Sequence, residues 1–143
     1  MSGPRGAGAS DAMVAQALSE VGSVSPQDAA ARMGRADVVV VDVRDAADWE
    51  RERIPGAVHA ARGMLEFHID PGSSFHLPVF GNAAAREFLF CCGSGARAAL
   101  SARLARAMGL NATCIAGGLR AWRAAALPLA GSSSSTSTPE SST

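Results

Sequence analysis

The chain has 143 residues, of which 48% are hydrophobic and 18% charged, enough for one domain with a buried core and too few for two ordinary ones. Its 13 basic residues are all arginine and balance 13 acidic residues, so the composition predicts no nucleic-acid partner and excludes lysine chemistry. Three cysteines, two of them adjacent, indicate a reducing compartment rather than a disulfide framework. The sequence has no secretory signal and no membrane-spanning run of ~20 apolar residues, which predicts a cytoplasmic protein with no membrane partner.

The N-terminal part predicts a helix that packs on the domain. Apolar residues recur at helical spacing from Asp11 to Val21, and a dimer contact through this helix is the alternative. We divide the chain into an N-terminal extension (1–22), a folded domain (23–131) and a disordered tail rich in serine and threonine (132–143). The expected apolar face consists of Met13, Val14, Ala17, Leu18 and Val21.

Helices and strands alternate in the first half of the folded domain. Ser25 is placed to cap a helix that begins at Pro26 and runs to about Met33. The β-branched run at 37–43 is typical of a strand buried on both faces of a parallel sheet. A short helix follows at 45–53 and a short strand at 57–60.

The second half continues this alternation. Strands are predicted at 88–91 and 111–115, and helices at 98–108 and 119–126, with Trp122 packed inward from the last helix. The order of elements predicts an α/β sandwich with a central, mainly parallel sheet.

A candidate active site lies where the strand at 88–91 ends. The next six residues, Cys92–Arg97, are small and glycine-rich, and a helix follows them. A strand, tight loop and helix in this order direct several N–H groups and the positive end of the helix dipole at one point, which favours the thiolate of a cysteine placed there. We therefore interpret Cys92 as a nucleophile in an anion-binding loop. The alternative is a buried cysteine beside a solvent-facing arginine.

This loop resembles the active-site loop of the rhodanese family, which has the pattern Cys-x-x-Gly-x-Arg, here Cys92, Gly95 and Arg97. The resemblance extends over about 23–131 and implies a three-layer rhodanese-like sandwich with a mainly parallel, five-stranded sheet flanked by helices. The other matching motifs are Asp42-Val43-Arg44, Trp49-Glu50, Ile54-Pro55-Gly56-Ala57, and Gly117-Gly118 with Trp122.

The adjacent cysteines allow two alignments of the loop with the family pattern, or registers, because either cysteine can be the nucleophile. Four residues separate Cys92 from Arg97, the spacing of sulfurtransferases, whereas five separate Cys91 from Arg97, the spacing of the related cysteine phosphatases. We favour Cys92, because Gly95 occupies the family's glycine position only in that register and because the apolar strand runs through Cys91. Phe90 also replaces the histidine that commonly precedes a phosphatase nucleophile. The alternatives are a phosphatase that uses Cys91 and a rhodanese-like binding module without catalysis.

The resemblance implies covalent sulfur transfer without a metal or organic cofactor. Cys92 would take a sulfane sulfur from a small-molecule donor such as thiosulfate and pass it as a persulfide to cyanide or a thiol. The persulfide would be held by the loop N–H groups of Gly93, Ser94, Gly95, Ala96 and Arg97. Two cations that thiosulfate sulfurtransferases commonly carry are replaced by Ser94 and Asp48, so a protein donor or acceptor of sulfur is equally compatible.

Four further residues are expected to support this site. Arg97 is predicted to pair with Asp42 or, as the second candidate, Glu66, and Arg44 either attracts the donor or locks the strand end in an ion pair. Arg62 and Glu66 lie four residues apart, so a helix would place them on one face. The segment 62–77 is then either a lid over the pocket, where Arg62 attracts an anionic donor, or a surface excursion.

Overall fold

The computed structural model describes residues 8–131, so the predicted disordered tail (132–143) and residues 1–7 lie outside its described part. The strands are β1 (Ser23–Val24), β2 (Val38–Asp42), β3 (Val58–His59), β4 (Glu87–Cys91) and β5 (Asn111–Ile115). The α-helices are α1 (Ala9–Val21), α2 (Pro26–Arg32), α3 (Ala46–Arg51), α4 (Leu65–Ile69), α5 (Ala96–Ala107) and α6 (Gly118–Ala124). The short 3₁₀ helices are η2 (Arg62–Met64), η3 (Pro78–Phe80) and η4 (Ala83–Ala85).

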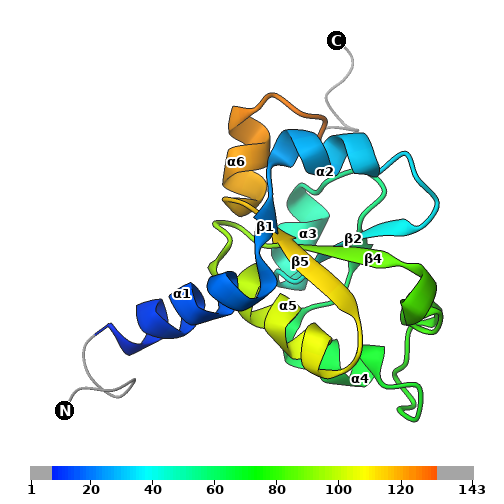
Figure 1. The fold of residues 1–143 in the computed structure, drawn as a ribbon. Coiled ribbons are helices and arrows are strands. Elements are labelled where there is room, and N and C mark those ends of the chain that lie inside the picture. The colour runs from blue at the N-terminus through cyan, green and yellow to red at the C-terminus, as the bar shows by residue number, and fades with distance from the viewer. Residues whose placement is uncertain (1–7, 132–143) are drawn as a thin grey trace.

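The strands form one parallel sheet in the order β1-β5-β4-β2-β3, with helices on both faces (Figure 1). The predicted three-layer α/β fold is therefore confirmed. Parallel neighbours need crossover connections, and these place helices over both faces of the sheet. β1, which pairs with β5, is not predicted by the sequence analysis, because two residues are too few to show a periodic pattern.

Two hydrophobic layers pack on the sheet, and alternate residues of each strand enter opposite layers. Phe88 and Phe90 of β4 face the layer formed with α1, α4 and α5, whereas Leu89 and Cys91 face the layer formed with α2 and α6. Each large apolar side chain buried in this way contributes roughly 1.5–3 kcal/mol. The alternation sends the adjacent cysteines to opposite sides of the sheet, since Cys92 belongs to the first layer.

Helix α1 begins two residues before the predicted start, and its apolar face is buried only in part. Ala17 and Val21 are 0% and 3% exposed, whereas Met13 and Leu18 remain 42% and 39% exposed. Figure 1 shows the N-terminal half of α1 extending away from the body of the domain, and the C-terminal half beside α5. Within this face, Ala17 and Val21 belong to the hydrophobic layer shared with α5, and Val14 packs against it.

Local sequence signals account for several of the other boundaries. The Ser25 hydroxyl accepts a hydrogen bond of 3.0 Å from the Asp28 N–H, the predicted cap of α2. Trp122 is 2% exposed, as expected, and its indole N–H donates to the Pro128 carbonyl. Helix α5 begins at Ala96 rather than Ala98, which brings its first turn against the loop that carries Cys92.

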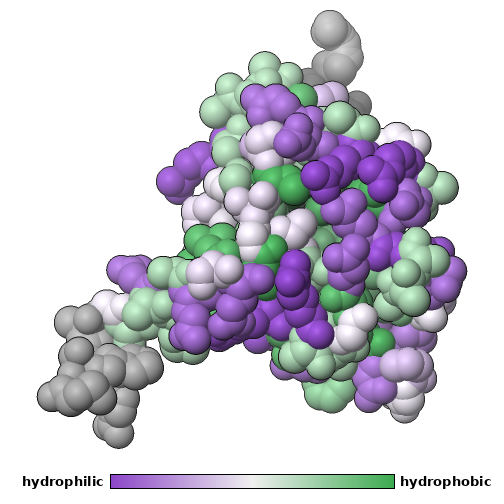
Figure 2. All heavy atoms as spheres, in the orientation of Figure 1, coloured by the Kyte–Doolittle hydropathy of each residue, from purple (hydrophilic) through white to green (hydrophobic). Residues whose placement is uncertain are grey.

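Hydrophilic side chains cover much of the visible face, and strongly hydrophobic residues show mainly in the gaps between them (Figure 2). Within residues 8–131, no helix has the length and hydrophobicity needed to cross a membrane.

Candidate active site

The loop after β4 holds the sulfur of Cys92 with backbone N–H groups. The Sγ atom accepts hydrogen bonds from the Gly95 N–H at 3.0 Å and the Ala98 N–H at 3.3 Å. Gly95 has a φ of +107°, in the region that favours glycine, and α5 begins at the next residue. The Ala98 contact was missed in the sequence analysis, which begins the helix there. Helix first turns leave N–H groups without intrahelical partners, so a start at Ala96 makes this donor available to the sulfur.

A pocket of about 360 Å³ lies over Cys92 at the carboxyl end of the sheet, where open α/β folds place their ligands. Its walls come from three places, namely the segment from the end of β2 through α3, the Cys92 loop, and α6. Five of the lining residues are arginines and one is a carboxylate, so the pocket favours an anionic ligand. The lining consists of Arg44, Asp48, Arg51, Cys92, Gly93, Ser94, Ala96, Arg97, Leu119, Arg120 and Arg123.

Arg44, which lines the pocket, forms a buried ion pair with Asp42. Its Nη2 atom is 2.8 Å from Asp42 Oδ2 and its Nε atom is 3.0 Å from Asp42 Oδ1, and the two residues are only 5% and 2% exposed. Arg44 also donates to the Glu52 carbonyl at 2.6 Å. Of its two predicted roles, the ion pair is the one that the structure shows, and it ties the end of β2 to the end of α3.

The predicted contact from Arg97 to Asp42 or Glu66 is wrong. Asp42 is taken by Arg44, and Glu66 lies 3.4 Å from Arg62. Arg97 instead has its Nη1 atom 4.0 Å from Asp45 Oδ1, in a pair whose side chains are 46% and 82% exposed. A pair this open to water adds little stability, so Arg97 does not hold the loop in place through a carboxylate.

Helix α6 holds the loop instead. The Leu119 N–H donates to the Cys92 carbonyl at 2.7 Å, and the Arg120 N–H donates to the Gly93 carbonyl at 3.0 Å. This approach requires Gly118, which has a φ of +60°, because a Cβ atom there would overlap the Cys92 carbonyl oxygen. The second glycine of the Gly-Gly motif therefore lets the last helix pack on the loop of Cys92.

We expect Gly118→Ala to be more destabilising than Gly109→Ala. Both glycines have a positive φ, but a Cβ at Gly109 meets nothing within 4 Å. Gly109→Ala therefore measures the backbone strain alone, and Gly118→Ala adds the overlap with the loop, which should cost about 1–3 kcal/mol more. Urea denaturation of the two variants measures the difference. Equal losses would mean that the loop can shift away from α6 at no cost.

The other two cysteines are buried outside the pocket. Burial, reinforced by the negative charge of Asp42, raises the pKa of the Cys91 thiol far above its ordinary value, so Cys91 stays protonated at neutral pH. Burial likewise raises the pKa of Cys114 to about 11, and its thiol donates to the Gly22 carbonyl at 3.4 Å. Of the three cysteines, Cys92 is the one that lines the pocket.

The segment 62–77 does not contribute to the lining of this pocket. Leu65 and Ile69 of α4 are buried in the layer shared with α1 and α5, while the pair between Arg62 and Glu66 is partly exposed. The structure therefore favours the second interpretation of the segment, a surface excursion held by its apolar residues.

The pocket arginines of α3 and α6 were also missed in the sequence analysis. Arg51, Arg120 and Arg123 line the pocket. Both helices follow strands whose carboxyl ends meet at one edge of the sheet. This position after the strands is the feature of the sequence that could have placed their arginines at the pocket. Among residues 8–131, no three histidine, cysteine or acidic side chains gather closely enough to hold a metal ion.

Comparisons with known proteins agree with this geometry. The model of the Rhodanese-like domain family matches residues 25–125. A protein of unknown function from Rhodopseudomonas palustris CGA009, described as a possible tyrosine phosphatase, is 41% identical, with a TM-score of 0.79 over 85% of this chain and 93% of that one. A thiosulfate sulfurtransferase from Pseudomonas aeruginosa is 26% identical, with a TM-score of 0.64 over 76% of this chain but only 19% of that one.

A rhodanese-like domain protein from Staphylococcus aureus, 20% identical, shares the fold with a TM-score of 0.58 over 70% of this chain and 89% of that one. No curated protein is similar enough to this chain to count as a match.

Proposed function

This chain belongs to the rhodanese-like domain family, and we propose that it is a sulfurtransferase that carries a sulfane sulfur as a persulfide on Cys92. The observation that carries the proposal is the position of the Cys92 sulfur, which accepts two backbone N–H groups at the base of a pocket rich in arginine. A thiolate needs such donors, and so does the persulfide anion that follows it.

The proposed reaction has two steps. The Cys92 thiolate attacks the outer sulfur of a donor such as thiosulfate, the bond between the two donor sulfurs breaks, and sulfite leaves with the bonding electron pair. The acceptor, cyanide or a thiol, then attacks the outer sulfur of the Cys92 persulfide and restores the thiolate. The N–H groups of Gly95 and Ala98 already point at the Cys92 sulfur before the reaction, so they stabilise its thiolate without reorganisation.

The arginines of the pocket support an anionic donor. The cations that thiosulfate sulfurtransferases commonly carry are absent at Ser94 and Asp48, but arginines of α3 and α6 bring positive charge to the same pocket. This charge suits thiosulfate, and it also suits the anionic persulfide of a protein donor.

A cysteine phosphatase is the second candidate, because the protein from Rhodopseudomonas palustris is described as a possible tyrosine phosphatase. In the longer register the nucleophile would be Cys91, whose side chain lies in the layer under α2 and α6 and does not line the pocket. Burial also keeps its thiol protonated at neutral pH, since the pKa of Cys91 is strongly raised. These two observations make the phosphatase the weaker proposal.

Mass spectrometry of the intact protein after incubation with thiosulfate tests the function. We expect a gain of one sulfur atom, which a reductant removes and which peptide mapping assigns to Cys92. Hydrolysis of an aryl phosphate, measured in parallel, should be negligible. No sulfur gain, together with phosphatase turnover that Cys91→Ser abolishes, would make the phosphatase the better proposal. No change in either assay would favour a binding module without catalysis.

A further inference from the structure

We propose that Arg120, on α6, is the residue that binds the oxyanion end of the sulfur donor and gives the pocket its preference for a dianion. The inference rests on the proposed function for the identity of the donor. Its structural basis is the distribution of charge around the pocket, which differs from one arginine to the next.

Four of the five pocket arginines have a carboxylate partner. Arg44 pairs with Asp42 at 2.8 Å, Arg51 with Asp48 at 2.7 Å and Arg97 with Asp45 at 4.0 Å, while Arg123 pairs with Glu52. Among residues 8–131, the side chain of Arg120 has neither an ion pair nor a hydrogen bond.

Arg120 is therefore the pocket arginine whose charge is available to a ligand without displacement of a carboxylate. The contact of Arg97 with Asp45, at 4.0 Å and open to water, is the weakest of the other four pairs. A guanidinium already bound to a carboxylate is largely neutralised, and an incoming anion must compete with that carboxylate. An anion that binds Arg120 displaces no such partner. The planar guanidinium also presents two parallel N–H donors, which match two oxygens of a sulfonate or sulfate-like group.

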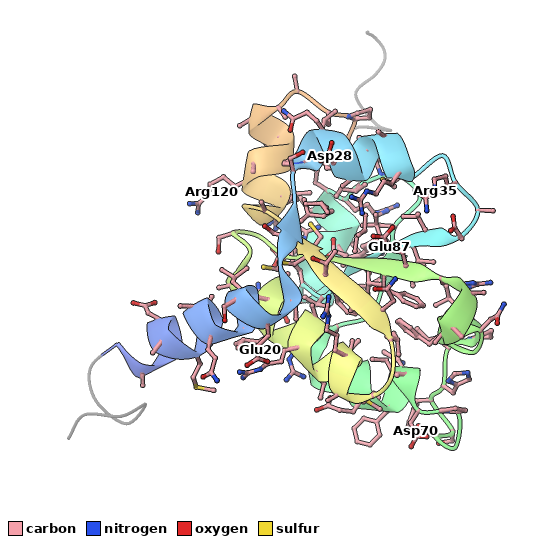
Figure 3. All side chains as sticks on the ribbon, in the orientation of Figure 1. Glu20, Asp28, Arg35, Asp70, Glu87 and Arg120 are labelled. Carbon is pink, nitrogen blue, oxygen red and sulfur yellow. The ribbon has the colours of Figure 1, made fainter. Side chains whose placement is uncertain are left out.

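The backbone places Arg120 at a set position relative to the nucleophile. Its N–H donates to the Gly93 carbonyl at 3.0 Å, and the preceding N–H, of Leu119, donates to the Cys92 carbonyl at 2.7 Å. Arg120 and Cys92 thus belong to one hydrogen-bonded unit and line the same pocket. Figure 3 shows the Arg120 side chain extending outward from α6, with no labelled acidic residue beside it.

This arrangement fits a donor with a reactive sulfur at one end and oxyanions at the other. Thiosulfate carries two negative charges at neutral pH, and methanethiosulfonate carries one on a similar frame. When Cys92 attacks the outer sulfur of either donor, the leaving sulfite or sulfinate lies on the far side of the breaking bond. Arg120 would hold that group, so its contribution should be greater for the dianion.

The test compares Arg120→Gln and Arg120→Lys with Arg35→Gln. Arg35 pairs with the exposed Asp37 before β2, and Figure 3 shows it on the opposite side of the molecule from Arg120. Both glutamine variants lower the net charge equally. We expect Arg120→Gln to raise the KM for thiosulfate about tenfold at low ionic strength, with kcat changed less than about twofold, the pattern of lost ground-state binding.

Four further results are expected. The increase in KM should shrink at high salt, Arg120→Lys should restore part of the affinity, and methanethiosulfonate should show a smaller increase. In a Cys92→Ser background, which cannot turn over, calorimetry should show weaker thiosulfate binding when Arg120 is also replaced by Gln.

Other outcomes overturn the inference. An unchanged KM in Arg120→Gln, or an equal increase in Arg35→Gln, would show that Arg120 does not bind the donor. A fall in kcat at constant KM would instead assign it to the positioning of the loop. If the wild type forms no persulfide but thiosulfate binding still depends on Arg120, the proposed function fails and the anion site remains.

Discussion

Replacement of Cys92 by serine is expected to abolish sulfur transfer from thiosulfate to cyanide, with a loss of at least about a thousandfold, because the nucleophile of a covalent mechanism is removed. Cys91→Ser should keep most of the activity. The Cys91 side chain is buried in the layer under α2 and α6 and does not line the pocket. Steady-state thiocyanate formation by the two variants measures the difference.

Alkylation provides an independent readout of the same assignment. Burial raises the pKa of Cys91 and Cys114, so both thiols should stay protonated and shielded at neutral pH. Iodoacetamide treatment of the folded protein, followed by peptide mapping, should therefore label Cys92 first. If Cys91 is labelled first and Cys91→Ser is the inactive variant, the register of the loop is wrong and the phosphatase proposal gains weight.

The choice of Cys92 could be made from the sequence because it depends on local backbone geometry. A residue with a φ of +107° is nearly always glycine, and Gly95 occupies that position in the structure. The strand before it is a continuous apolar run, and the helix after it is rich in alanine and leucine. Each of these signals acts within a few residues of chain, where sequence patterns are most informative.

The partners of the charged residues could not be found in this way. Arg97 was expected near Asp42 or Glu66, but its partner is Asp45, because Arg44 occupies Asp42 in the interior. Which arginine reaches a carboxylate depends on where helices far apart in the sequence lie in space. Helices α3 and α6 both line the pocket over the Cys92 loop because the order of the strands in the sheet brings them to the same place, and this order cannot be read from local sequence patterns.

The apolar face of α1 shows a second limit. Its periodicity identifies Met13 and Leu18 together with Ala17 and Val21, yet the first pair is exposed and the second buried. A helical pattern gives the direction of a face, but the extent to which that face is covered depends on the length and position of its neighbour, α5.

Loss of Asp42 should produce the largest change in stability. Asp42→Ala leaves the guanidinium of Arg44, 5% exposed, without its counter-ion, and it also removes the acceptor of the Arg44 backbone N–H. Breaking one partner of a buried pair costs about 3–5 kcal/mol. Asp37→Ala is the matched control, since it breaks the exposed pair with Arg35 and should change stability little.

Urea denaturation midpoints of Asp42→Ala and Asp37→Ala, at matched pH and salt, measure the difference in stability. A third variant, Asp42→Asn, removes the negative charge of the side chain but keeps its shape. The amide keeps an acceptor for the Arg44 N–H but not the negative charge, so its loss should fall between those of Asp37→Ala and Asp42→Ala. Arg44 links the end of β2 to the Glu52 carbonyl after α3. The more a variant destabilises the protein, the more mobile the α3 wall of the pocket should therefore become. A loss in Asp42→Ala no greater than in Asp37→Ala would mean that water reaches Arg44 readily and that the pair does not hold this wall in place.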